Sequence, residues 1–132
     1  MSKIIALIAI VFGTMAASGA AADEMLDVCI DATDGNTPAV IDCVTAATGR
    51  ADAQLNQNYK QLVNRLLELD SDIHQKEQLK KAQRAWLVYR DANCSFYADP
   101  EGGAEARLNG GICLMNTTAQ RAMELLTLIN KY

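Results

Sequence analysis

Four cysteines constrain this chain more than any other feature of its sequence. Cys29, Cys43, Cys94 and Cys113 are spread between residues 29 and 113 of the 132 residues. An even number of cysteines in a small exported domain is typical of a disulfide framework. Four cysteines allow three pairings, and we favour Cys29–Cys43 with Cys94–Cys113, because both pairs close short loops. Each loop has the size for which chain entropy predicts about 3 kcal/mol of stabilisation.

The N-terminus indicates that the chain is exported. Lys3 is the only charge before Asp23, and it is followed by the apolar run Ile4–Phe12 and then by small residues. A short positive start, an apolar core and an Ala-x-Ala exit predict a signal peptide over residues 1–22, cleaved after Ala22. The alternative is an uncleaved membrane anchor, because the uncharged stretch nearly reaches the roughly 20 residues that span a bilayer. Its weakly apolar second half favours cleavage, which leaves a periplasmic or secreted chain without a membrane span.

Cleavage leaves one domain, residues 23–132, with an excess of acid. The full chain has 12 Lys and Arg against 16 Asp and Glu, a net charge of −4. Without Lys3 the balance is 11 against 16, a net charge of −5. This charge disfavours nucleic acid as a partner, because phosphate binding relies on Lys and Arg. It favours a basic partner, whose association an acidic surface accelerates.

Apolar residues at spacings of three and four predict an all-α fold. We expect helices over residues 24–32, 37–69, 72–97 and 112–130, arranged as three main helices in an up-down bundle with an N-terminal helical arm. Thr37 is the expected N-cap of the longest helix, because Pro38 suits its first turn. The Gly-rich segment 99–111 is expected to be a loop. The two disulfides would then lie at opposite ends of the helical run.

The same spacings predict the side chains that form the core. On the longest helix the stripe comprises Val40, Val44, Ala47, Ala51, Leu55, Tyr59, Leu62 and Leu66. On the following helix it comprises Leu79, Ala82, Trp86, Tyr89 and Asn93. On the last helix it comprises Met115, Ala119, Ala122, Leu125 and Ile129.

No recognised catalytic or metal-binding motif stands out in the sequence. His74 is the single histidine and lies close to Asp70 and Asp72. A metal or acid–base site is one interpretation; an exposed histidine at a capped helix start is favoured, because acids there complement the helix dipole. Zinc is disfavoured, since there is no C-x-x-C pair and His74 is far from every cysteine in sequence. We therefore predict a protein that is not an enzyme and uses no metal or cofactor.

The segment from Ala82 to Cys94 is the most distinctive part of the chain. Trp86 and Tyr89, three residues apart, predict core packing. Arg90 and Asp91 cannot both point inward from a helix. We therefore expect one of them to make an ion pair or to bond a helix-end carbonyl, in a structural role.

This segment belongs to a wider pattern that resembles the LprI-type lysozyme inhibitor domain of small exported bacterial proteins. The matching residues are Cys43, the run 52–59, the run 82–94, Gly102, Gly103, Cys113, Thr118, Arg121 and Leu125. The resemblance spans roughly residues 29 to 128. It implies a helical, disulfide-bonded envelope or secreted protein that binds and blocks a host-type lysozyme. The alternative is a structural or stress-related envelope protein with no lysozyme contact.

The resemblance directs attention to segment 99–111 as an inhibitory loop. Lysozymes are typically basic and use two carboxylates in a cleft. The loop could offer a cation from Arg107 and an amide from Asn109 to those acids, with Glu101 beside them. Its base would be pinned by Cys94–Cys113, which lowers the entropy lost on binding. The alternative is a tolerated surface loop without a partner.

Overall fold

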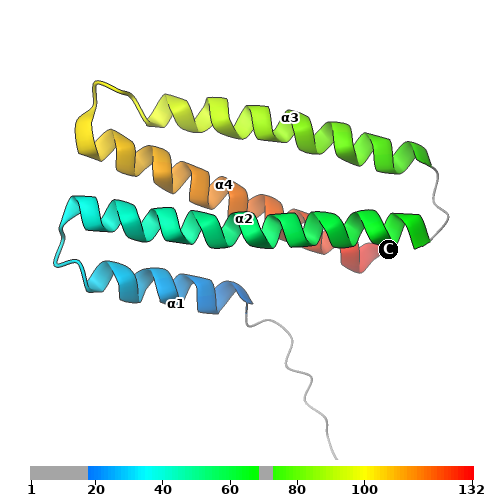
Figure 1. The fold of residues 1–132 in the computed structure, drawn as a ribbon, viewed down its shortest axis with the longest axis horizontal. Helices are drawn as coiled ribbons and strands as arrows, with labels where there is room; N and C mark the ends of the chain where they lie inside the picture. The colour runs from blue at the N-terminus through cyan, green and yellow to red at the C-terminus, as the bar shows by residue number, and fades with distance from the viewer. Residues whose placement is uncertain (1–17, 69–72) are drawn as a thin grey trace, which may run out of the picture.

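The computed structural model describes residues 18–68 and 73–132, which form four α-helices. They are α1 (Ser18–Asp31), α2 (Thr37–Glu68), α3 (Ile73–Tyr97) and α4 (Gly103–Lys131). Consecutive helices run antiparallel, so α2 and α4 run in the same direction (Figure 1). The predicted all-α bundle with an N-terminal arm is confirmed. Most of the predicted signal peptide, and the acids at 70 and 72, lie outside the described residues.

The core lies between the two parallel helices. Leu55, Leu62 and Leu66 of α2 are buried against Ala122 and Leu125 of α4. The apolar stripe predicted on α2 is confirmed, because every member is buried or half-buried. Further apolar side chains pack around this cluster: Tyr59, Leu79, Trp86, Leu128 and Ile129.

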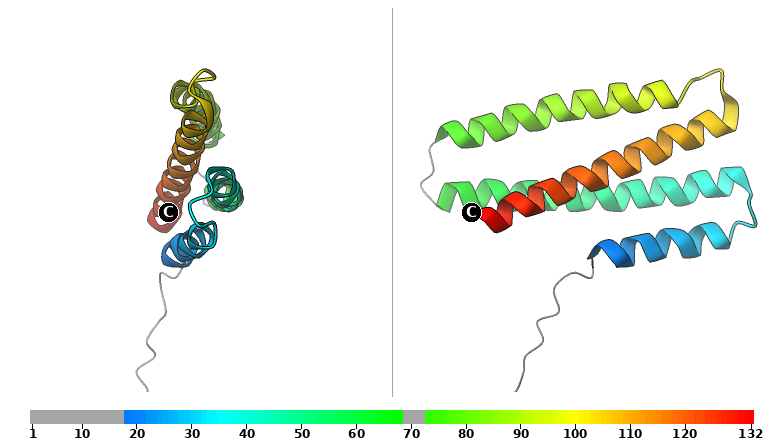
Figure 2. Two further views of the ribbon diagram at one scale, coloured as in Figure 1. Left: turned by 90° about the vertical axis from the view of Figure 1, so that its left-hand side faces the viewer. Right: turned by 180° about the vertical axis from the view of Figure 1, so that it is seen from behind.

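The two outer helices are attached differently. α3 packs mainly on α4, whereas α1 contacts α2 alone among the helices. Both views in Figure 2 place α1 and α3 on opposite sides of the α2–α4 pair. No helix in the described ranges is both long enough and apolar enough to cross a membrane.

The N-cap of α2 differs from its prediction by one residue, although the helix begins at Thr37 as expected. The side-chain Oδ1 of Asn36, not Thr37, accepts a hydrogen bond from the backbone N–H of Ala39 at 3.1 Å. Asn36 is therefore the N-cap, a role for which asparagine is among the best residues. Asp34 and Gly35 precede it with φ of 50° and 78°. This left-handed backbone turns the chain tightly between α1 and α2.

The predicted loop over residues 99–111 is wrong over most of its length, because α4 begins at Gly103. The turn between α3 and α4 is confined to residues 98–102. The later glycines serve close packing. A Cβ on Gly110 would lie 2.4 Å from the Cβ of Ala98, and one on Gly111 would lie 3.3 Å from Cγ1 of Val44. They let the turn and α2 approach the α4 backbone.

Parts of the stripes predicted on α3 and α4 are also wrong. Tyr89 is 59% exposed, and Ala82 and Ala119 are exposed too. The inner faces carry polar groups instead: Gln83 and Thr118 are buried. When the inner stripe of a helix is chosen by hydrophobicity, polar residues such as these are placed on the outer face. This explains the error.

Both predicted disulfides are confirmed. Cys29–Cys43 joins α1 to α2 and Cys94–Cys113 joins α3 to α4, with Cα atoms 5.8 and 5.4 Å apart. They do not lie at opposite ends of the molecule. In an up-down bundle the α1–α2 and α3–α4 turns fall at the same end, seen at the left of Figure 1. We call this end, formed by residues 31–36 and 98–109, the stapled end.

Candidate functional site

Acidic side chains concentrate at the stapled end. Its five acids, all of them exposed, are Asp31, Asp34, Asp99, Glu101 and Glu105. Basic residues are scarce there: within the described chain none lies between Ser18 and Arg50, and only Arg107 lies between Arg90 and Arg121. Most of the other Lys and Arg residues lie toward the opposite end of the bundle or along its middle. The stapled end is therefore the negative pole of an acidic chain.

The α3–α4 turn is held by several short-range bonds. The backbone N–H groups of Glu101 and Gly102 donate to Oδ1 and to the carbonyl of Asp99, both at 3.0 Å. The N–H of Ala98 donates to the carbonyl of Cys94 at 3.1 Å. Together with the disulfide just behind it, these bonds fix the turn before any partner arrives.

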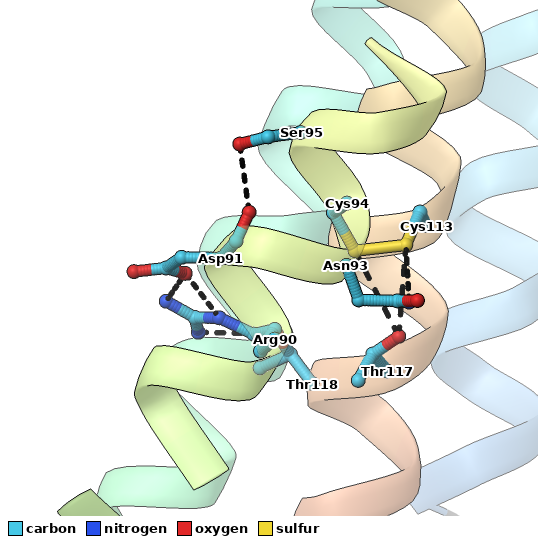
Figure 3. Close-up of a disulfide and its surroundings, with 8 residues drawn as sticks. All are labelled: Arg90, Asp91, Asn93, Cys94, Ser95, Cys113, Thr117 and Thr118. Atoms are coloured by element: carbon cyan, nitrogen blue, oxygen red, sulfur yellow. Dashed lines mark hydrogen bonds and ion pairs between the residues drawn. A yellow bond between two sulfur atoms is a disulfide. The ribbon is translucent and has the colours of Figure 1, made fainter. Parts of the chain in front are cut away.

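The surroundings of the Cys94–Cys113 bond reinforce this brace, as Figure 3 shows. Asn93 Nδ2 donates to Sγ of Cys113 at 3.5 Å. The hydroxyl of Thr117 lies 3.9 Å from the same sulfur and 4.0 Å from Sγ of Cys94. Polar side chains of both helices therefore surround the disulfide.

The structure does not bring together the two residues proposed for the inhibitory loop. Arg107 and Asn109 are both exposed, but they lie in α4. Residues two apart on a helix are separated by about 200° around its axis and do not face each other. Glu105 and Asn109, four apart, share a face. Glu101 lies in the turn, four residues before Glu105 in the sequence.

Arg90 of the distinctive segment is the centre of a polar network, and Figure 3 shows its contacts with Asp91 and Thr118. Its Nη1 lies 3.1 Å from Oδ1 of Asp52 on α2 and donates to Oγ1 of Thr118 on α4 at 3.3 Å. Its Nε and Nη2 both lie 2.9 Å from Oδ1 of Asp91. The expected ion pair is confirmed, and it links three helices.

The ring of Trp86 is contacted by two arginines, Arg90 and Arg121. The guanidinium carbons of Arg90 and Arg121 are 5.3 and 5.9 Å from the centroid of its ring. Arg121 also donates from Nε to Oε1 of Gln83 at 3.1 Å. Trp86 therefore packs as core, as predicted, whereas Tyr89 on the same helix faces outward.

Asn58 is a further interior residue that the sequence did not single out. It is 2% exposed. Its Nδ2 donates to the carbonyl of Ala122 at 2.7 Å, and its Oδ1 accepts from Nε2 of Gln54 at 2.8 Å. Its position three after Leu55 and four before Leu62, inside the apolar stripe of α2, was the available signal. These interior bonds fix the register of the helices rather than form a reaction site.

A groove and the single histidine lie away from the stapled end. An open groove of about 470 Å³ lies between α2 and α3, with Tyr59, Lys80, Gln83 and Arg84 among its lining residues. His74 is exposed in the first turn of α3. Among the described residues, no group of three or more His, Cys, Asp or Glu side chains could hold a metal ion.

Fold and site define a small helical protein braced by two disulfides, with exposed acids concentrated at one end. The family model described as Lysozyme inhibitor LprI matches residues 29–125 of the chain. This protein therefore belongs to the LprI lysozyme inhibitor family. The matched region contains both disulfides and the whole Arg90 network.

One relative and the solved structures complete the comparison. An uncharacterized protein of Rhizobium meliloti (strain 1021) is 34% identical over 88 residues. The match covers 60% of this chain and 63% of that protein, so slightly less than two thirds of the relative's length is spanned. No solved structure matches the chain.

Proposed function

We propose that this protein inhibits a basic lysozyme by docking its stapled end against the enzyme. The family supplies the class of activity. The observation that carries the proposal is the segregation of five exposed acids, with one nearby arginine, onto the end that both disulfides brace. Such a surface attracts a basic enzyme and orients the encounter. Because the turn is already fixed, less conformational entropy is lost on binding.

The contact is assigned to the face of α4 that carries Glu105 and Asn109, together with Glu101 in the turn. The carboxylates would meet basic side chains around the cleft of the enzyme. The amide N–H groups of Asn109 would donate to the carboxylates that lysozymes use. Arg107 points to another side of α4 and takes no part in this contact.

A clearing assay on bacterial cell walls tests the electrostatic part. The double variant Glu101→Gln with Glu105→Gln should inhibit about tenfold more weakly at low salt, and the deficit should shrink at high salt as screening grows. Its matched control is Glu68→Gln with Glu77→Gln, which removes two exposed acids far from the stapled end. Equal losses in the two double variants would show that overall charge, not the stapled end, determines inhibition.

Single variants of α4 test the assignment to one face. Asn109→Ala should weaken inhibition several-fold, whereas Arg107→Ala should leave it unchanged or strengthen it, because loss of a cation makes this end more acidic. If Arg107→Ala weakens inhibition and Asn109→Ala does not, the contact would instead be a cation from Arg107 to the carboxylates of the enzyme. If the chain inhibits no class of lysozyme at any salt concentration, the structural or stress-related envelope role replaces this proposal.

Export belongs to the same proposal, since disulfides persist in oxidising compartments such as the periplasm. We expect the protein recovered from the periplasm or medium to begin at Asp23. Mass spectrometry of its N-terminal peptide measures this, and an intact N-terminus starting at Met1 would favour a retained anchor.

A further inference from the structure

A second apolar face runs along α3, on a different side from the core. Its five members, spaced three and four apart, are Ala82, Ala85, Tyr89, Ala92 and Phe96. All five are exposed, Tyr89 at 59% and Phe96 at 81%. Apolar residues repeating at three and four form the seam of a coiled coil. We call these five residues the α3 seam.

The seam has no partner within the described chain. The inner face of α3 presents Gln83, Trp86, Arg90 and Cys94 to the rest of the bundle, and these residues point to a different side. Val88, 71% exposed, adds to the apolar edge of the seam. With two aromatic side chains, the seam offers on the order of 500 Å² of surface, which is large for a patch that stays bare.

The sizes of the seam residues fit a second α3 running in the opposite direction. Centring such a pair on Tyr89 sets Phe96 of each copy opposite Ala82 of the other. Each tyrosine then lies beside the alanines at 85 and 92 of its partner. Phe96 therefore meets Ala82 at both ends of the seam, and the two tyrosines meet at the two-fold axis, where the alanines at 85 and 92 leave room for their rings.

The charges of α3 favour the same direction. Its first half carries four bases and one acid, Glu77; Lys80 and Arg84 line the groove against α2, whereas Lys81 is next to the seam residue Ala82. The turn beyond the last residue of α3 carries Asp99 and Glu101. An antiparallel pair places the basic half of one helix beside the acidic turn of the other. A parallel pair would bring like charges together.

We propose that two copies of this chain associate through the α3 seam as an antiparallel, two-fold symmetric dimer. One patch meets itself in such an interface. Two seams together bury about 1,000 Å², the lower end of the range for specific association. The dimer is therefore reversible, with partners exchanging in solution.

Sedimentation equilibrium of the full chain with both disulfides intact tests the dimer, from about 1 μM to about 1 mM. The unmodified chain should pass from monomer to dimer across this range. Tyr89→Glu should raise the dimer dissociation constant at least about thirtyfold, because it buries charge at the centre of the seam. Met123→Glu is the control, an equal change at a side chain 56% exposed on α4. A monomer at every concentration, or equal effects of both variants, would overturn the proposal.

Zero-length carbodiimide cross-linking of mixed isotopically light and heavy copies tests the direction. Amide bonds between Lys81 of one copy and Asp99 or Glu101 of the other are expected. Mixed-isotope links confined to the basic halves, such as Lys81 to Glu77, would show a parallel pair and refute the arrangement. The test of this proposal is separate from that of inhibition, because Tyr89 itself is not part of the surface proposed to dock on lysozyme. Tyr89→Glu should leave inhibition per chain unchanged.

Discussion

Arg90 links more of this molecule than any other single side chain in its described part. Its side chain is 14% exposed and contacts Asp52, Asp91 and Thr118, while its guanidinium also lies against Trp86. A planar guanidinium can donate in several fixed directions at once, whereas a lysine ammonium is a single compact charge. The arginine fork is therefore what connects α2, α3 and α4 at this point.

Replacing this fork should cost stability even when the charge is kept. Arg90→Lys should lower the free energy of unfolding by about 2 kcal/mol, because Thr118 or Asp52 loses its partner in a mostly buried site. Urea unfolding followed by circular dichroism measures this. Arg65→Lys is the control: Arg65 is 51% exposed and pairs with Glu68 on the surface, so its change should stay within about 0.5 kcal/mol. Similar losses of unfolding free energy in both variants would show that Arg90 contributes no more to stability than a surface arginine.

Polar residues in the interior are where reasoning from the sequence failed. The paired role of Arg90 and Asp91 followed from their being adjacent on a helix, and the core role of Trp86 followed from its type. Asn58, Gln83 and Thr118 could not be assigned, because a buried polar residue is stable only with a partner. Those partners are Ala122, Arg121 and Arg90, which lie 28 to 64 residues away. Periodicity alone carries no information about such contacts.

The helix boundaries also show what apolar periodicity predicts and what it does not, and the start of α4 is the main example. Four helices and their main apolar faces follow from spacings of three and four, and α2 was placed almost to the residue. The start of α4 was missed by nine residues, since glycine weakens a helix in isolation. Glycine fits at position 110 because Ala98 leaves no room for a Cβ there. The missed boundary displaced the candidate site, because Arg107 and Asn109 became helical.

The two disulfides should have unequal effects, because the helices they hold are attached differently. Cys94 and Cys113 are 19 residues apart, and both belong to helices that build the core. Replacing both by alanine should lower the free energy of unfolding by about 3 kcal/mol. Cys29–Cys43 holds α1, which contacts only α2. Replacing that pair by alanine should release α1 and leave the rest of the bundle folded.

Hydrogen exchange of backbone amides distinguishes these results. Loss of Cys29–Cys43 should speed exchange in α1 while the amides around Leu62 and Leu125 keep their protection. Loss of Cys94–Cys113 should speed exchange throughout α3 and α4. Uniform acceleration in both variants would mean that the chain unfolds as one unit and that α1 is part of its core.

At the scale of the whole molecule, the stapled end and the α3 seam are different surfaces. The direction of α3 in the dimer determines where the two stapled ends lie. α3 is 25 residues long, so at 1.5 Å per residue it extends roughly 37 Å. In an antiparallel pair the C-terminal ends of the two α3 helices point in opposite directions. The two stapled ends therefore lie at opposite ends of the dimer, where the acidic turn of each borders the basic half of the partner's α3, while the α4 face with Glu105 and Asn109 is not part of the seam.

This arrangement predicts the stoichiometry of the inhibited complex, on the basis of both proposals. At concentrations where the chain is dimeric, light scattering after gel filtration with excess lysozyme should give the mass of two chains with two enzymes. Tyr89→Glu should give one chain with one enzyme and equal inhibition per chain. A one-to-one complex from the unmodified dimer would show that lysozyme competes for the seam, so the docking surface would extend from the turn onto Phe96. Absence of any complex, with the dimer intact, would reject the inhibitor function and leave the seam as the only interface.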